Sequence, residues 1–108
     1  MFENLYDAVS FLFSHWWPTV DGTTTAVDVE RIPHARGPDS LRLAVAYQFS
    51  IGGDGPYTGE SLWHPVFCEI RRVRAAKRKL RVHQHVLVRY RPDDPSVNRL
   101  DRREWRRL

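Results

Sequence analysis

Residues 41–51 alternate between apolar and polar or small side chains over their whole length. The apolar set is Leu41, Leu43, Val45, Tyr47, Phe49 and Ile51, and the residues between them are Arg42, Ala44, Ala46, Gln48 and Ser50. Successive side chains of a β-strand point to opposite faces of its sheet. This period of two therefore predicts a long strand with one buried face.

A hairpin is predicted directly after this strand. Residues 52–56 read Gly-Gly-Asp-Gly-Pro, a composition typical of a tight turn. Residues 57–63 then form the return strand. We therefore expect residues 41–51 and 57–63 to pair as antiparallel neighbours.

Three further strands are predicted from composition and alternation. Residues 22–32 are rich in β-branched side chains and end at a loop, 33–39, that contains Pro33, Gly37 and Pro38. Residues 86–91 alternate again, with Val86, Val88 and Tyr90 on one face. Residues 92–95, Pro-Asp-Asp-Pro, are typical of a turn and lead to a short last strand at 96–100.

Two segments have helical periodicity. Apolar residues in 2–17 fall on one wide stripe, from which Phe11 is displaced, and Pro18 ends the segment. A second helix is predicted from Pro65 to about Arg81. Its narrow apolar stripe consists of Val66, Ile70, Val73, Ala76 and Leu80.

The predicted order of elements is helix, three strands, helix, two strands. A helix between the third and fourth strands is the order of an OB-type barrel. We therefore expect a mainly β (α+β) fold, a small five-stranded barrel or sandwich of OB-like order with an extra N-terminal helix. The 108 residues suit one domain. Its expected parts are the amphipathic helix 1–17, the β-rich domain 18–100 and a basic tail 101–108.

Charge divides the chain into an acidic and a basic part. Residues 68–108 contain 14 of the 17 basic residues but only 5 of the 13 acidic ones. Such asymmetry favours an acidic partner, an anionic surface, or self-association of unlike faces, and it is also found on ordinary solvated surfaces. The candidate binding residues are an arginine ridge on the second helix and two arginines of the following strand: Arg71, Arg74, Arg78, Arg81, Arg89 and Arg91.

The single cysteine, Cys68, excludes an intramolecular disulfide and fits a reducing compartment. No stretch approaches the roughly 20 apolar residues that a membrane span needs. The first residues carry Glu3 and Asp7 where a signal peptide carries positive charge. We therefore expect a cytoplasmic domain without a membrane span.

Candidate chemistry is sparse. His64, Cys68, His83 and His85 are the weak candidates for a zinc site, although a lone cysteine is more often a small buried side chain. Asp93 and Asp94 are adjacent between two prolines and are better explained as turn formers than as an acid–base pair. No nucleophile motif or phosphate-binding glycine loop is present. We therefore expect no enzymatic activity, no cofactor and no metal.

The first helix is the candidate self-association element. Phe11, Trp16 and Trp17 would contribute apolar area to a homodimer, and two-fold dimers are the commonest assembly. The competing interpretation is that this helix caps the open end of its own barrel.

Three motifs occur in a distinctive order. Trp17-Pro18 is followed by Gly22; Tyr47-x-Phe49 and Gly52 are followed by Tyr57-x-Gly59; and the chain ends with Val86-x-Val88-x-Tyr90-x-Pro92-x-x-Pro95 and Leu100. Over roughly residues 16–100 the chain thereby resembles the family known as domain of unknown function 3592. Members usually have a glycine near the place of His83, and many have membrane-spanning helices beside the domain. The resemblance implies a β-rich accessory domain and assigns no catalytic residue.

The leading functional hypothesis is a non-catalytic protein-binding or assembly module. The alternative is a nucleic-acid-binding OB-like domain that uses the basic helix face, since such folds track a phosphate backbone with cations. An enzyme with an unrecognised site is the third hypothesis.

Overall fold

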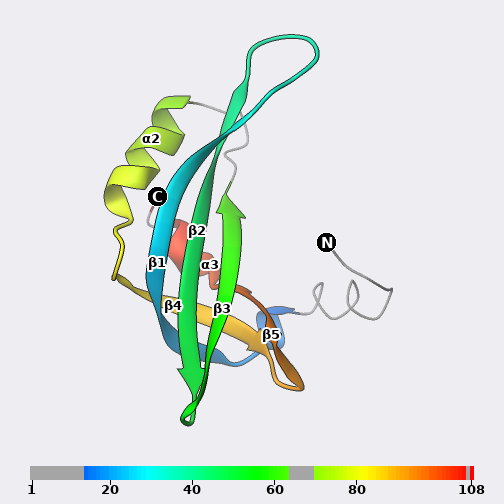
Figure 1. Cartoon of the computed structure of the whole chain (residues 1–108), viewed down its shortest axis with the longest axis vertical. Helices are drawn as coiled ribbons and strands as arrows, with labels where there is room; N and C mark the ends of the chain where they lie inside the picture. The colour runs from blue at the N-terminus through cyan, green and yellow to red at the C-terminus, as the bar shows by residue number, and fades with distance from the viewer. Residues whose placement is uncertain (1–13, 64–69, 107) are drawn as a thin grey trace.

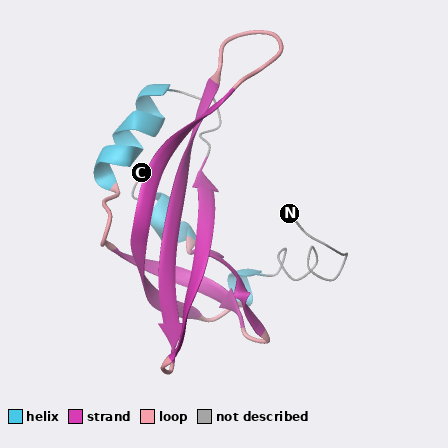
Figure 2. Ribbon diagram, viewed as in Figure 1, coloured by secondary structure: helices cyan, strands magenta, loops and turns pink. Residues whose placement is uncertain are grey.

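The computed structural model describes residues 14–63, 70–106 and 108, and five strands account for most of them. The elements are η1 (Ser14–Trp16), β1 (Thr19–Ile32), β2 (Ser40–Ile51), β3 (Asp54–Trp63), α2 (Ile70–Lys79), β4 (His85–Arg91), β5 (Asp94–Leu100) and α3 (Arg102–Arg106). Figure 1 shows β1 and β2 as long, curved neighbours whose connecting loop projects from the rest of the molecule. Figure 2 shows how strands dominate the fold and how short the helices are.

The strands form one antiparallel sheet in the order β3-β2-β1-β4-β5, and the sheet curls until its two ends approach each other. At this seam the Asn98 side-chain amide of β5 donates to the Thr58 carbonyl of β3 at 3.2 Å. The Leu100 N–H donates to the Ser61 hydroxyl at 3.1 Å. The expected mainly β, five-stranded barrel is thus confirmed as a nearly closed barrel. Its strand order matches the expected one in part, since side chains rather than a backbone ladder join β3 to β5.

The core follows the alternation of β2. Leu43 and Val45 have no exposed surface, and Tyr47 and Phe49 are almost completely buried. Val86 and Val88 of β4 belong to the same apolar cluster, and Tyr90 packs against it, with its ring 6.2 Å from that of Phe49. The predicted burial of this face is therefore confirmed. Buried apolar area is the main favourable term in folding, so this cluster stabilises the barrel.

A close contact at Gly59 holds the seam together. The Tyr47 hydroxyl donates to the Asn98 Oδ1 at 2.6 Å, directly over Gly59. A Cβ atom at Gly59 would lie 2.0 Å from that Oδ1 and 2.6 Å from the Tyr47 Cζ. Burial raises the pKa of Tyr47 to about 12, although the hydrogen bond with Ser61 and the charge of Arg99 act in the opposite direction. The absence of a side chain at residue 59 thus permits the hydrogen bond between β2 and β5.

The two helices expected from the sequence are each described in part. The helix expected from Pro65 to Arg81 is described as α2, over Ile70–Lys79, and residues 64–69 lie outside the described residues. Of the expected N-terminal helix, Ser14–Trp17 are described, and Ser14–Trp16 form a 3-10 turn rather than an α-helix. Residues 1–13, with Phe11, lie outside the described part. The basic tail contains α3, a helix that the sequence pattern did not indicate.

His83 occupies a backbone conformation that favours glycine. Its φ is 66°, and no other described non-glycine residue has a positive φ. The residue follows α2 and precedes β4, and its N–H donates to the Thr24 carbonyl at 2.9 Å. The family resemblance implied a glycine near this place, and glycine adopts this positive φ without steric cost.

Candidate functional site

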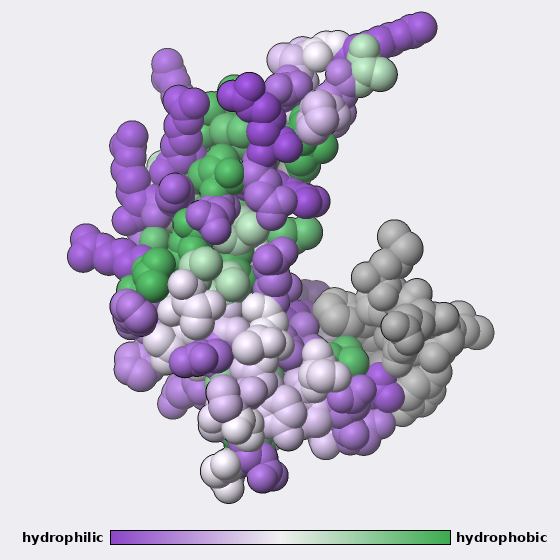
Figure 3. Space-filling view, viewed as in Figure 1, coloured by the Kyte–Doolittle hydropathy of each residue, from purple (hydrophilic) through white to green (hydrophobic). Residues whose placement is uncertain are grey.

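The first candidate site is the outer face of α2 and the residues that follow it. The buried side chains Val73, Ala76 and Leu80 pack the helix against the core. All its cations are exposed. This α2 cationic face comprises Arg71, Arg72, Arg74, Lys77, Arg78, Lys79 and Arg81. In Figure 3, long hydrophilic side chains project from the side of the molecule where Figure 1 places α2.

The charges of the α2 cationic face are not neutralised within the described part of the chain. No ion pair joins any of its cations to another described residue. The Arg72 guanidinium lies 5.6 Å from the centre of the Trp63 ring, a cation–π contact that holds one arginine toward β3. The predicted ridge residues Arg71, Arg74, Arg78 and Arg81 therefore lie together on one accessible surface.

The two remaining predicted binding arginines lie on β4 and form local contacts. Arg89 donates from Nε to the Asp101 Oδ2 at 2.7 Å and from a terminal nitrogen to the Trp17 carbonyl at 2.6 Å. Arg91 donates from Nε to the Asp93 Oδ1 at 2.8 Å. Since Val86 and Val88 face the core, Arg89 extends from the opposite face of β4, whereas Arg91 follows an irregularity in the β4–β5 pairing and its side chain is only 11% exposed. The structure therefore separates them from the α2 cationic face.

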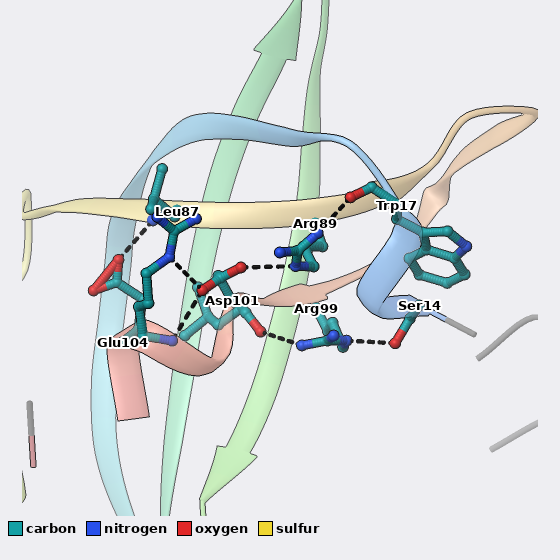
Figure 4. Close-up of polar contacts among 9 residues, drawn as sticks. Ser14, Trp17, Leu87, Arg89, Arg99, Asp101 and Glu104 are labelled. Carbon is teal, nitrogen blue, oxygen red and sulfur yellow. Dashed lines mark hydrogen bonds and ion pairs between the residues drawn. The ribbon is translucent and has the colours of Figure 1, made fainter. Parts of the chain in front are cut away.

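A buried carboxylate organises the end of the barrel where β5 meets α3 (Figure 4). Asp101 is only 2% exposed and accepts hydrogen bonds from Arg89 and from the side chain and backbone of Arg103. Burial acts to raise the pKa of Asp101, but the hydrogen bonds from Arg103 and the charge of Arg89 outweigh it and lower the pKa to about 2. Asp101 thus remains ionised and fixes two arginines.

Glu104 ties α3 to the barrel. Its side chain has no exposed surface, and its Oε2 accepts the Leu87 N–H of β4 at 2.7 Å.

Arg99, on β5, donates to the Ser14 hydroxyl at 2.6 Å and to the Leu100 carbonyl at 3.0 Å. The sequence predicted a basic tail at residues 101–108 and did not indicate this polar network. The residues 101–108 carry only two apolar side chains, Trp105 and Leu108, as a signal of packing.

Two adjoining hollows open at this end of the molecule. The larger, about 580 Å³, is lined by Ser14, Glu60, Ser61, Leu62, Asn98, Arg99, Leu100, Arg102 and Trp105. The smaller, about 230 Å³, is lined by Arg89, Arg99, Asp101, Arg102, Arg103 and Arg106. Arg99 and Arg102 line both hollows. Burial lowers the pKa of Arg99, and the positive charges of Arg89 and Arg102 lower it further.

Two of the four candidate metal ligands lie in the described part of the chain. His83 and His85 are exposed, and His64 and Cys68 lie outside the described residues. Among the residues that are described, no group of three or more histidine, cysteine, aspartate or glutamate side chains could hold a metal ion. Asp94 accepts the Ser96 hydroxyl at 2.6 Å, a contact typical of a turn.

The tryptophans proposed for self-association lie in different environments. Trp16 is 77% exposed, whereas Trp17 is buried and its carbonyl accepts the Arg89 hydrogen bond. Phe11, the third residue of that set, lies outside the described part of the chain.

Fold and site define the class of protein: a small, mainly β barrel domain with two separate arginine-rich surfaces. Comparison with known protein families classifies the chain more narrowly than the fold does. The chain belongs to the family described as domain of unknown function 3592, whose sequence model matches residues 20–105. No curated protein and no solved structure matches the chain. In the described part of the chain, no helix has the length and apolar character needed to cross a membrane.

Proposed function

We propose that this domain is a non-catalytic binding module that holds an acidic segment of a partner protein against the α2 cationic face. The observation that carries the proposal is the row of exposed cations without ion pairs to other described residues. Like charges held on one short helix repel one another, and an anionic partner relieves that repulsion. Because the face is exposed, such a complex gains speed and specificity from charge more than it gains affinity.

A second candidate is a nucleic acid, bound through its phosphates by the same face. Arg71, Arg74 and Arg78 follow spacings of three and four residues, which align guanidinium groups along one side of a helix. An acidic protein is favoured over a single-stranded nucleic acid because base stacking needs exposed aromatic rings. Near this face the described ring is Trp63, which is half-buried and covered by Arg72.

The test measures binding of a short oligoglutamate peptide and of a short DNA, both as a single strand and as a duplex, by fluorescence anisotropy at several salt concentrations. The double variant Arg71→Gln/Arg74→Gln is compared with Arg31→Gln/Arg36→Gln, which removes the same charge from the β1–β2 loop region, where Arg31 is paired with Asp39. Two exposed ion pairs contribute about 0.2–1 kcal/mol each, so the first variant should weaken peptide binding by about two- to thirtyfold. The second should change it little.

The outcomes separate the hypotheses. If both double variants lost the same amount of peptide affinity, binding would depend on net charge alone, and the α2 cationic face would be rejected as a site. Much tighter binding of either form of the DNA than of the peptide, with the same dependence on Arg71 and Arg74, would favour the nucleic-acid candidate. If none of the probes binds even at low salt, the proposed function is wrong.

A further inference from the structure

We propose that the two adjoining hollows between β3, β5 and α3 form a binding site for a small organic phosphate monoester. The phosphate group binds at Arg99, Arg102 and Arg106, and the organic part lies in the larger hollow beside Trp105. This site is separate from the α2 cationic face and does not depend on the proposed function.

The charge of the smaller hollow selects an anion. Its lining contains five arginines and a single aspartate. Asp101 is already shared between Arg89 and Arg103, at 2.7 and 2.9 Å. Arg102 and Arg106 are exposed and form no ion pair with another described residue. A positive excess therefore remains beside Arg99, whose own pKa is lowered by burial and then by the charges around it.

The number of guanidinium groups favours a phosphate over a carboxylate. A carboxylate has two oxygens and one charge, which a single arginine can satisfy bidentately. A phosphate monoester carries about −1.5 to −2 charges and three acceptor oxygens near neutral pH. Arg99 and Arg102 line both hollows, and Arg106 lines the smaller one, so these three arginines line the same hollow. This arrangement suits an anion with three terminal oxygens.

The larger hollow provides a place for the organic part. Its volume of about 580 Å³ lies within the range of small-molecule sites. Trp105 and Leu62 supply apolar surface, and Ser61 and Asn98 supply polar groups. Glu60 also lines this hollow and disfavours an anionic group near β3. The ligand is therefore oriented with its phosphate toward α3.

The site is preorganised by buried contacts. Asp101, 2% exposed, fixes Arg103, and Glu104, fully buried, anchors α3 to the Leu87 N–H. Arg99 is held by the Ser14 hydroxyl and the Leu100 carbonyl, as Figure 4 shows for Ser14. Little side-chain freedom remains to be lost at Arg99 when a ligand binds, which favours affinity.

The test titrates the full chain with adenosine 5′-monophosphate, with adenosine, and with inorganic phosphate, following the indole N–H signals by NMR. The signal of Trp105 is identified from the variant Trp105→Phe. Adenosine 5′-monophosphate should shift this signal saturably, adenosine should not, and inorganic phosphate should compete. Arg102→Gln should raise the Kd about tenfold, the usual value of one charge-assisted hydrogen bond.

The matched control is Arg36→Gln, which removes one exposed arginine from the projecting loop. An equal loss of affinity in this variant would show that only net charge matters and would overturn the proposal. Equal binding of adenosine would also overturn it, because the phosphate would then contribute nothing. Binding that depends on Arg71 and Arg74 rather than on Arg102 would move the ligand to α2 and refute this site alone.

A 5′-phosphorylated oligonucleotide distinguishes the source of the phosphate. The larger hollow has room for one small organic body, so extra nucleotides should add little affinity. An oligonucleotide that binds far more tightly than the mononucleotide, with the same loss in Arg102→Gln, would assign the site to a nucleic-acid end and reject a small molecule.

Discussion

Gly59→Ala is expected to destabilise the barrel by opening its seam. The new Cβ would lie 2.0 Å from the Asn98 Oδ1 and 2.6 Å from the Tyr47 Cζ and hydroxyl oxygen. Displacing either neighbour alone would break the 2.6 Å hydrogen bond between the Tyr47 hydroxyl and Asn98. Tyr47 is 1% exposed, so its hydroxyl would lose the Asn98 acceptor in a buried place, where Ser61 is its other hydrogen-bond partner.

Two free-energy costs add in the Gly59→Ala variant. A buried donor without an acceptor costs about 1–3 kcal/mol, and overpacking costs about another 1–3 kcal/mol. The expected loss is therefore about 2–6 kcal/mol, a large part of the roughly 5–15 kcal/mol that a domain has in total. Urea denaturation followed by circular dichroism measures the change. If Gly59→Ala unfolded at the same urea concentration as the wild type, the close contact at Gly59 would not stabilise the barrel.

Gly52→Ala is the matched control. A Cβ at Gly52 would have no atom within 4 Å, and the residue has a φ of 55°. Its cost is therefore limited to the left-handed backbone, about 1–2 kcal/mol. The variant Asn98→Ala removes the seam hydrogen bond and one of the clashing atoms. In that background Gly59→Ala should cost less than in wild type, and equal costs would exclude coupling between the two residues.

Further predictions concern charge and backbone strain. Asp101 has a folded pKa of about 2 against an ordinary value of 3.8, so its ionised form contributes about 2 kcal/mol above pH 4. That contribution should be lost as the pH falls from about 4 to 2, and Asp101→Asn should be less stable at neutral pH and less sensitive to acid, as urea titrations at several pH values would show. For His83, whose φ is 66°, replacement by glycine should raise the melting temperature slightly and replacement by valine should lower it. Reversal of that order would contradict the strain argument. Val45→Asp should unfold the domain, because Val45 has no exposed surface and a buried unpaired carboxylate costs several kcal/mol; a folded variant by circular dichroism would exclude the core assignment.

The part of the fold that could be predicted is the part with regular side-chain spacing. The alternation in β2 identified its buried face, and the glycines after Ile51 located the β2–β3 hairpin. Both signals are local, because a period of two depends only on backbone geometry. The closure at β3 and β5 had no such signal. It depends on Gly59 meeting Tyr47 and Asn98, residues that are far apart in the sequence.

The polar network at α3 was missed for a related reason. Asp101 and Glu104 occur among arginines, and charged residues in such a segment are normally exposed. Their burial depends on partners supplied by β4: Arg89 for Asp101 and the Leu87 N–H for Glu104. The sequence shows neither contact, because the partners lie 12 and 17 residues earlier in the chain, on β4.

The cations of residues 68–108 form one basic segment in the sequence, but in the folded chain they lie in three different environments. On α2 the cations are exposed and have no ion pairs within the described residues. On β4, Arg89 and Arg91 are each bound to an aspartate and support the fold. Around α3 the arginines line a hollow. Since exposed charges farther apart than about 8–10 Å are largely screened at physiological salt, separated groups should act on different ligands. Removing charge from α2 should therefore affect a macromolecular partner, and removing it from Arg102 should affect the small phosphate, without either change reproducing the other.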